Sequence, residues 1–283
     1  MNAFSRSWEL TKVSFSVIGK DKELLLFPLI ALGLSIVFLV GALYPTVFIH
    51  MADDGSAEMG FLQVAALFVT YLGLAFIGTF SNMCIVYTAR KRFDGGDATF
   101  GESIRFTMKR LHLVLGWATV SATVGLILRG LDEAAERAGP AGAVLISLLR
   151  SVLGMAWGAI TLFVIPSMVY KGTTPIPAIK DSIRVLKESW GESVIRSVGF
   201  GLMQFLAFGL GALVFGGLLS VAGGGTASVA LIIVGITYFV GVVLLFMLAE
   251  MIYNTALYHY ATSGQVAEGY TQEVMTSAFR TKD

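Results

Sequence analysis

The chain has 283 residues, of which 55% are hydrophobic and only 14% are charged, and its mean hydropathy is +0.77. Soluble domains carry about 25% charged residues, so a chain this apolar would expose too much apolar surface to stay in water. The net charge of +1 provides no overall field for nucleic acid, and a single cysteine excludes a disulfide within the chain.

Six apolar runs are long enough to cross a bilayer, which takes about 20 residues of helix. They are too long and too continuously apolar for barrel strands of about 9–11 alternating residues, so the predicted fold is all-α. The first run also exceeds the roughly 7–15 apolar residues of a signal peptide, which predicts a retained anchor. The predicted spans are Leu24–Ile49, Phe61–Thr88, Leu111–Leu128, Ser151–Tyr170, Ser197–Ala222 and Val229–Ala249, the last continuing as helix to about Tyr260.

The basic residues predict which side of the membrane each connection faces. Seventeen of the 20 Lys and Arg residues lie in the N-terminal segment, the second and fourth connections and the C-terminal tail. The other three are Arg129, Arg137 and Arg150. The bias of Lys and Arg toward cytoplasmic loops therefore predicts that both termini are cytoplasmic.

A charged segment between the fourth and fifth spans has the pattern of an amphipathic helix. Ile179, Ile183, Leu186, Trp190 and Val194 follow at spacings of 4, 3, 4 and 4, which places them on one stripe. Residues 4–15 and 100–111 have similar stripes, and Ser7, Ser103 and Ser182 coincide when the three segments are aligned without gaps.

Each amphipathic segment precedes a pair of spans. The sequence thus predicts one membrane domain built as three hairpins, each led by an amphipathic helix. The predicted pseudo-repeats are 1–90, 97–171 and 176–262, and residues 263–283 are predicted to form a cytoplasmic tail helix. Two placements of the leading helices remain open: in the membrane interface, where Lys and Arg meet anionic head groups, or packed together as a cytoplasmic collar.

Three stretches resemble a known family: "SRSWELTKVSFSVIGKDKELLLFPLIALG", "IPSMVYKGTTPIPAIKDSIRVLKESWGESVIRSVGFG" and "ALYHYATSGQVAEGY". They are similar to an uncharacterised family of prokaryotic six-span integral membrane proteins, known only as a domain of unknown function. The resemblance covers nearly the whole chain. It implies this architecture and a prokaryotic cytoplasmic (inner) membrane, and it brings no functional residues with it.

Four polar residues are predicted to lie at similar depth near the cytoplasmic ends of the spans: Asn82, Gln204, Glu250 and Asn254. One interpretation is a polar vestibule that opens to the cytoplasm, because ionisable and polar residues inside a membrane commonly mark a solute path. The other is hydrogen bonding between helices, worth about 0.6 kcal/mol for each bond, with Glu250 reaching toward water.

Small residues four apart allow close approach of helix backbones, either within one subunit or between subunits. The candidate packing residues are Gly154, Gly158, Ala207, Gly211, Ala212 and Gly216. Pro166 is predicted to kink the fourth span because it leaves the carbonyl of Leu162 without a donor. The kink is either structural or a gating hinge.

The functional expectation is a passive channel or permease for small solutes or ions, acting as a homo-oligomer among membrane lipids. A non-conducting scaffold or lipid-organising protein is the alternative, and a lipid-modifying enzyme ranks third. The sequence contains no His-Glu-x-x-His, P-loop or paired-cysteine motif, and no nucleophile or acid–base group converges at the interface. We therefore expect no enzymatic activity, cofactor, metal site or nucleic-acid partner.

Overall fold

The computed structural model describes residues 15–16, 18–19, 21–51, 61–190, 199–270 and 272, and every regular element among them is helical. Six helical segments of this part are long and apolar enough to cross a membrane. The protein is therefore a polytopic, all-α membrane protein. It divides into two compact units, one of residues 27–88 and 98–185 and the other of residues 1–26, 89–97 and 186–283. We call them the four-span unit and the two-span unit.

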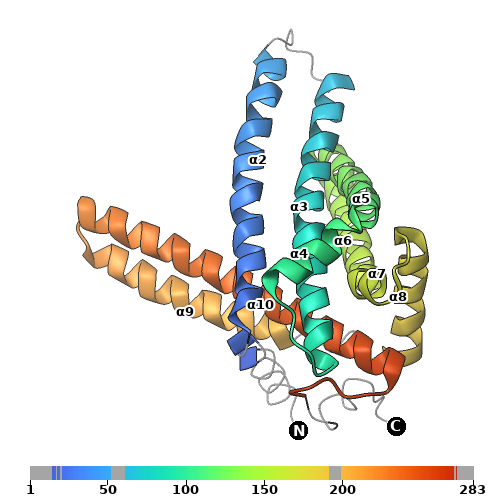
Figure 1. Cartoon of the computed structure of the whole chain (residues 1–283). Helices are drawn as coiled ribbons and strands as arrows, with labels where there is room; N and C mark the ends of the chain where they lie inside the picture. The colour runs from blue at the N-terminus through green and yellow to red at the C-terminus, as the bar shows by residue number, and fades with distance from the viewer. Residues whose placement is uncertain are drawn as a thin grey trace. The chain divides into compact units, whose positions relative to one another are not determined.

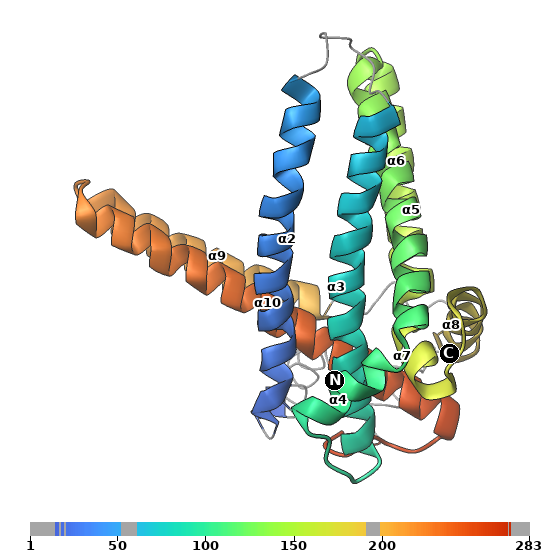
Figure 2. The same ribbon diagram turned by 45° about the horizontal axis from the view of Figure 1, so that its top comes forward.

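The four-span unit holds the spans side by side (Figures 1 and 2). The Phe38 ring lies against Gly73, where an added Cβ would come within 2.1 Å of the ring. The Trp117 and Trp157 rings stack with centroids 5.8 Å apart. Its helices are α2 (Leu26–Met51), α3 (Phe61–Phe93), α4 (Phe100–Met108), α5 (Leu111–Arg137), α6 (Pro140–Thr161), α7 (Val164–Lys171) and α8 (Pro175–Trp190).

The fourth span is interrupted near Pro166, as its sequence predicts. α6 ends at Thr161 and α7 begins at Val164. Pro166 lies in the first turn of α7. The missing N–H is tolerated there because the N–H groups of a first turn have no acceptor within the helix. The span therefore consists of two helices, and a hinge at this point remains a prediction.

The predicted connection between the third and fourth spans is wrong. The predicted spans end at Leu128 and resume at Ser151, but α5 continues to Arg137 and α6 begins at Pro140. Alanine and glutamate favour helix, and Pro140 occupies the first turn of α6. Arg150, which the sequence placed at the start of a span, lies inside α6 and pairs with Asp132 at 3.0 Å.

The two-span unit contains η1 (Lys22–Leu25), α9 (Gly199–Val221) and α10 (Thr226–Ser263). α9 and α10 form a hairpin, and the Tyr238 hydroxyl donates to the Ala207 carbonyl at 2.9 Å. Helix α10 has 38 residues and ends at Ser263, and the following Gly264 has a φ of 71°, which favours glycine. The continuation of the sixth span beyond its apolar core is thus confirmed.

Two of the predicted amphipathic segments are helices, α4 and α8. The first predicted segment, residues 4–15, lies outside the described residues except for Phe15, whose ring lies 5.7 Å from that of Phe246. Most of the predicted tail helix also lies outside them. The described part of the tail includes Tyr270, whose ring packs at 6.2 Å against Phe93.

Candidate functional site

The junction of α3 and α4 contains a buried cluster of hydroxyl and thiol groups. The hydroxyls of Thr88 and Ser103 share a hydrogen bond of 2.7 Å, and Thr88 also donates to the Cys84 carbonyl at 3.0 Å. The Cys84 thiol lies 3.2 Å from the Thr107 hydroxyl. All four residues are almost completely buried. Helix α4 is thus docked on α3 by polar groups that satisfy one another.

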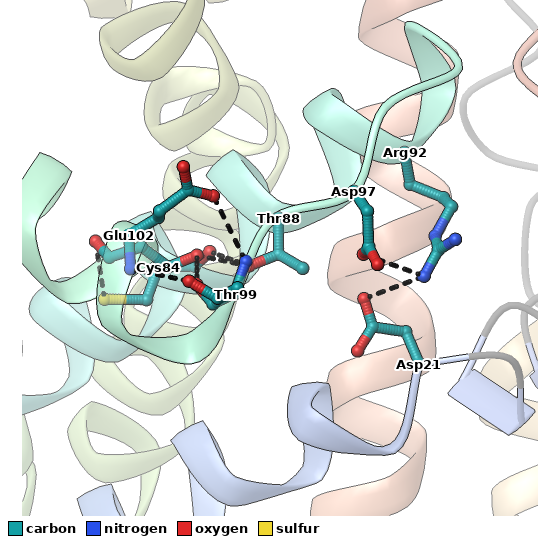
Figure 3. A network of polar contacts seen from close by, with 8 residues as sticks. Asp21, Cys84, Thr88, Arg92, Asp97, Thr99 and Glu102 are labelled. Carbon is teal, nitrogen blue, oxygen red and sulfur yellow. Dashed lines mark hydrogen bonds and ion pairs between the residues drawn. The ribbon is translucent and has the colours of Figure 1, made fainter.

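The two flanks of α4 are held by aromatic pairs and its start by a capping box. Phe100 stacks on Phe27 with centroids 4.8 Å apart, and Phe106 stacks on Tyr87 at 4.1 Å. The Glu102 N–H donates to the Thr99 hydroxyl, and the Thr99 N–H donates to the Glu102 carboxylate, as Figure 3 shows. This reciprocal pair satisfies two donors that a helix start leaves open.

The junction of α7 and α8 is organised around a buried carboxylate. Asp181 accepts from Lys171 Nζ at 2.7 and 2.8 Å and from the Ser167 hydroxyl at 2.8 Å, and it also pairs with Arg184. Its side chain is 8% exposed. Beside it, the buried Ser182 hydroxyl accepts the Phe163 N–H at 3.1 Å, at the break between α6 and α7. The carboxylate and the hydroxyl together fasten α8 to the end of the fourth span.

The two-span unit has its own buried carboxylate, Asp21. A single Arg92 nitrogen bridges it to Asp97, at 3.3 Å and 3.2 Å respectively (Figure 3). Burial raises the pKa of Asp21 above its usual value, although the hydrogen bond and the charge of Arg92 act in the opposite direction. The sequence did not predict a role for Asp21, Asp181 or Ser167, because no sequence pattern indicates that a polar side chain next to a span is buried.

The four proposed vestibule residues are divided between the two units. Asn82 belongs to the four-span unit, and the other three belong to the two-span unit. Gly211 faces Tyr238 across the antiparallel α9–α10 hairpin. This register places Gln204 of α9 opposite residue 245 of α10. Residue 245 is five residues, or about 8 Å along α10, from Glu250. Asn254 is buried, Asn82 and Gln204 are half-buried, and Glu250 is exposed.

These four side chains have one property in common. None of them forms a hydrogen bond or an ion pair with any residue that the structure describes. The hydroxyl of Ser81, next to Asn82, is buried and also has no partner. Within the described part of the chain these groups make no hydrogen bond between helices, and both interpretations of the sequence stay predictions.

The proposed packing residues divide into two groups. Gly211 is closely covered, since an added Cβ would lie 2.3 Å from the Tyr238 ring, and Ala207 receives the hydrogen bond from the same side chain. Gly154, Gly158 and Gly216 face open space, and Ala212 is exposed. Among the proposed small residues of α9, Ala207 and Gly211 pack against described residues of the chain, and Ala212 and Gly216 do not.

The hydroxyl, thiol and carboxylate groups described above bind one another or neighbouring cations. Among residues 15–16, 18–19, 21–51, 61–190, 199–270 and 272, no three His, Cys, Asp or Glu side chains gather as metal ligands. The Cys84 thiol is buried.

Comparison with known proteins gives a family and no function. No curated protein matches the chain. A family model described as "Family of unknown function (DUF6159)" matches residues 61–268, which include the junctions of α3 with α4 and of α7 with α8. The chain belongs to this family of unknown function, DUF6159.

Proposed function

We propose that the protein is a passive channel or permease for small solutes or ions, acting as a homo-oligomer. The observation that carries this proposal is the set of polar side chains within the spans that lack a partner in the described chain: Asn82, Gln204, Glu250 and Asn254. An unpaired polar group in hydrocarbon costs several kcal/mol. Water in a solute path, or a neighbouring subunit, would remove that cost.

Glu250 supports the proposal most directly. It lies on an exposed stripe of α10 with Val243 and Met247, which are 40% and 39% exposed. A carboxylate on an apolar, membrane-embedded face is expensive and is a usual marker of an ion or solute path. We infer that this stripe meets water or a second copy of the chain, since lipid tails alone would leave the carboxylate without solvation.

The remaining architecture belongs to the same proposal. The protein lies in a prokaryotic cytoplasmic membrane, with both termini cytoplasmic and the six spans arranged as three hairpins, each led by an amphipathic helix. The excess of Lys and Arg on one side supports the sidedness, and α4 and α8 support two of the leading helices. Single cysteines placed at Gly139 and Gly224 in a Cys84→Ser background should react with an impermeant thiol reagent in intact cells. Reaction only after lysis would overturn this sidedness.

The test of conduction is solute and ion flux into vesicles that contain the purified protein. We expect Glu250→Gln and Asn82→Leu to lower the flux or alter its selectivity while the unfolding midpoint changes little. Thr237→Val is the matched control, because the Thr237 hydroxyl lies in the same span as Glu250 and already donates to the Ile233 carbonyl. This control should conduct normally.

Two outcomes contradict the proposal. If both variants conduct normally and only their stability changes, the four polar groups have a structural role. If the wild-type protein conducts no solute or ion, the protein is better described as a non-conducting scaffold or lipid-organising protein. The docking of α4 and α8 on the ends of the spans would suit that second function.

A further inference from the structure

Helix α8 has three distinct faces around its axis. One face is buried against the four-span unit and consists of Ala178, Asp181, Ser182 and Val185. A second, half-buried face holds Ile179, Ile183 and Leu186 from the predicted apolar stripe. The third face is exposed, so the helix is docked on the protein by one side, partly covered on the second and open on the third.

The carboxylate of Asp181 is turned inward and neutralised. Its side chain is 8% exposed and is bound by Lys171, Ser167 and Arg184. The negative charge therefore contributes little to the outer surface of the helix. The other acidic residue of α8, Glu188, comes after the three cations in the sequence.

The exposed face of α8 is cationic. Lys180, Arg184 and Lys187 follow at spacings of 4 and 3, which places them on one side of the helix, and all three are exposed. Neither Lys180 nor Lys187 has an ion-pair partner in the described part of the chain. Ile176, one turn before Lys180, is 56% exposed and extends the half-buried apolar face to the start of the helix.

These faces lie at the end of a membrane span. The membrane-spanning segment Pro140–Lys171 ends only three residues before α8 begins at Pro175. Basic residues this close to a span meet the anionic surface of a bilayer and contribute roughly 1 kcal/mol each. An apolar strip beside a basic strip is the pattern of a helix lying in the interface.

We propose that α8 is an interfacial helix whose Lys180, Arg184 and Lys187 face binds the anionic head groups of membrane phospholipids. The apolar strip from Ile176 to Leu186 rests at the acyl boundary, and the buried face stays docked on the protein through Asp181 and Ser182. The two placements that the sequence left open are thus combined, because the helix is both packed on the protein and in contact with lipid. This inference is independent of conduction.

The test measures lipid selectivity of the intact protein in bilayers of phosphatidylcholine with phosphatidylglycerol. Spin-labelled phosphatidylglycerol should be enriched over phosphatidylcholine in the lipid shell of the wild-type protein. Lys180→Gln with Lys187→Gln should lower the relative association constant about thirtyfold, because two cations that contribute roughly 1 kcal/mol each are removed. Arg184 is left in place since it also pairs with Asp181. Both lysines are exposed, so the unfolding midpoint should not change.

The control removes two exposed cations elsewhere on the four-span unit, Arg129→Gln with Arg137→Gln. It should retain the selectivity for phosphatidylglycerol. The proposal is overturned if the lysine variant keeps the wild-type selectivity, or if the control loses as much. It is also overturned if inorganic phosphate displaces the lipid, which would indicate a free-anion site, or if the lysines are needed for cross-linking of two copies, which would indicate a protein partner.

Discussion

Helices α4 and α8 both follow a long span directly, yet they are fastened to it by different interactions. α4 is held by neutral hydroxyl and thiol groups and by two aromatic stacks. α8 is held by one buried carboxylate with cationic partners and by a hydroxyl that accepts a backbone N–H. Each helix has a fully buried serine in its docking face, Ser103 or Ser182. The same placement of a surface helix is therefore compatible with either apolar or electrostatic attachment.

This difference affects what the outer faces offer. In α4 the aromatic residue of the predicted stripe, Phe100, is used in packing, and the acidic Glu102 lies on the outside as part of the cap. In α8 the acidic Asp181 is inside, and the apolar strip is only half-buried. The comparison indicates that attachment through a buried charge, as in α8, leaves apolar and basic side chains of the helix available to the membrane.

The largest expected effect comes from removing the buried carboxylate. Asp181→Ala leaves Lys171 and Ser167 without their shared acceptor. Breaking a buried ion pair costs about 3–5 kcal/mol, and we expect about 3 kcal/mol, the lower end, because Lys171 and Arg184 are partly solvated. The measurement is the free energy of unfolding in mixed micelles.

The matched variant on α4 is Glu102→Ala. Glu102 occupies the corresponding position 79 residues earlier, but it is exposed and serves a helix cap. Loss of a cap costs about 1 kcal/mol. Equal losses for the two variants would show that α4 and α8 do not differ in the way described.

The apolar contacts should show a smaller difference with the order of the helices reversed, because here the variant on α4 should lose more stability than the variant on α8. Phe100→Ala removes the stack on the buried Phe27 and should cost about 2 kcal/mol, because the ring is half-buried and stacked pairs add to area burial. Ile179→Ala, 79 residues later, removes a half-buried aliphatic side chain and should cost about 1 kcal/mol. Unfolding of the two variants in the same micelles gives the comparison, and a larger loss for Ile179→Ala would contradict it.

Most of the fold follows from the sequence because hydropathy and helix breakers report on local chemistry. Spans such as Phe61–Thr88 and the interruption at Pro166 have local causes. The prediction for the connection between α5 and α6 is wrong because charged residues do not require a loop: Glu133 pairs with Arg129 along α5, and Asp132 pairs with Arg150 of α6. Charge indicates solvent, and it does not by itself end a helix.

The candidate sites were harder to predict, since a sequence gives the depth of a residue and leaves its neighbours undetermined. Asn82 and Gln204 were grouped by depth, yet they belong to different units. The docking of α4 and α8 had a signal in the aligned Ser103 and Ser182, but the burial of Asp181 depends on Lys171 folding back from α7. That contact joins residues ten positions apart, on two helices separated by a turn, and a helical periodicity does not predict it.

The smallest expected effect is a difference in how strongly two serines, Ser103 of α4 and Ser182 of α8, are coupled to a hydroxyl of the preceding span. Ser103 bonds directly to the Thr88 hydroxyl, whereas Ser167, 79 residues after Thr88, bonds to Asp181 and Ser182 bonds to a backbone N–H. A double-mutant cycle of Thr88→Val with Ser103→Ala should give a coupling of about 0.5–1 kcal/mol, and a cycle of Ser167→Ala with Ser182→Ala a coupling below about 0.3 kcal/mol. Unfolding of the single and double variants measures both. Strong coupling of Ser167 to Ser182 would mean that α8 is held by a hydroxyl pair like that of α4, and the contrast between the two helices would then rest on Asp181 alone.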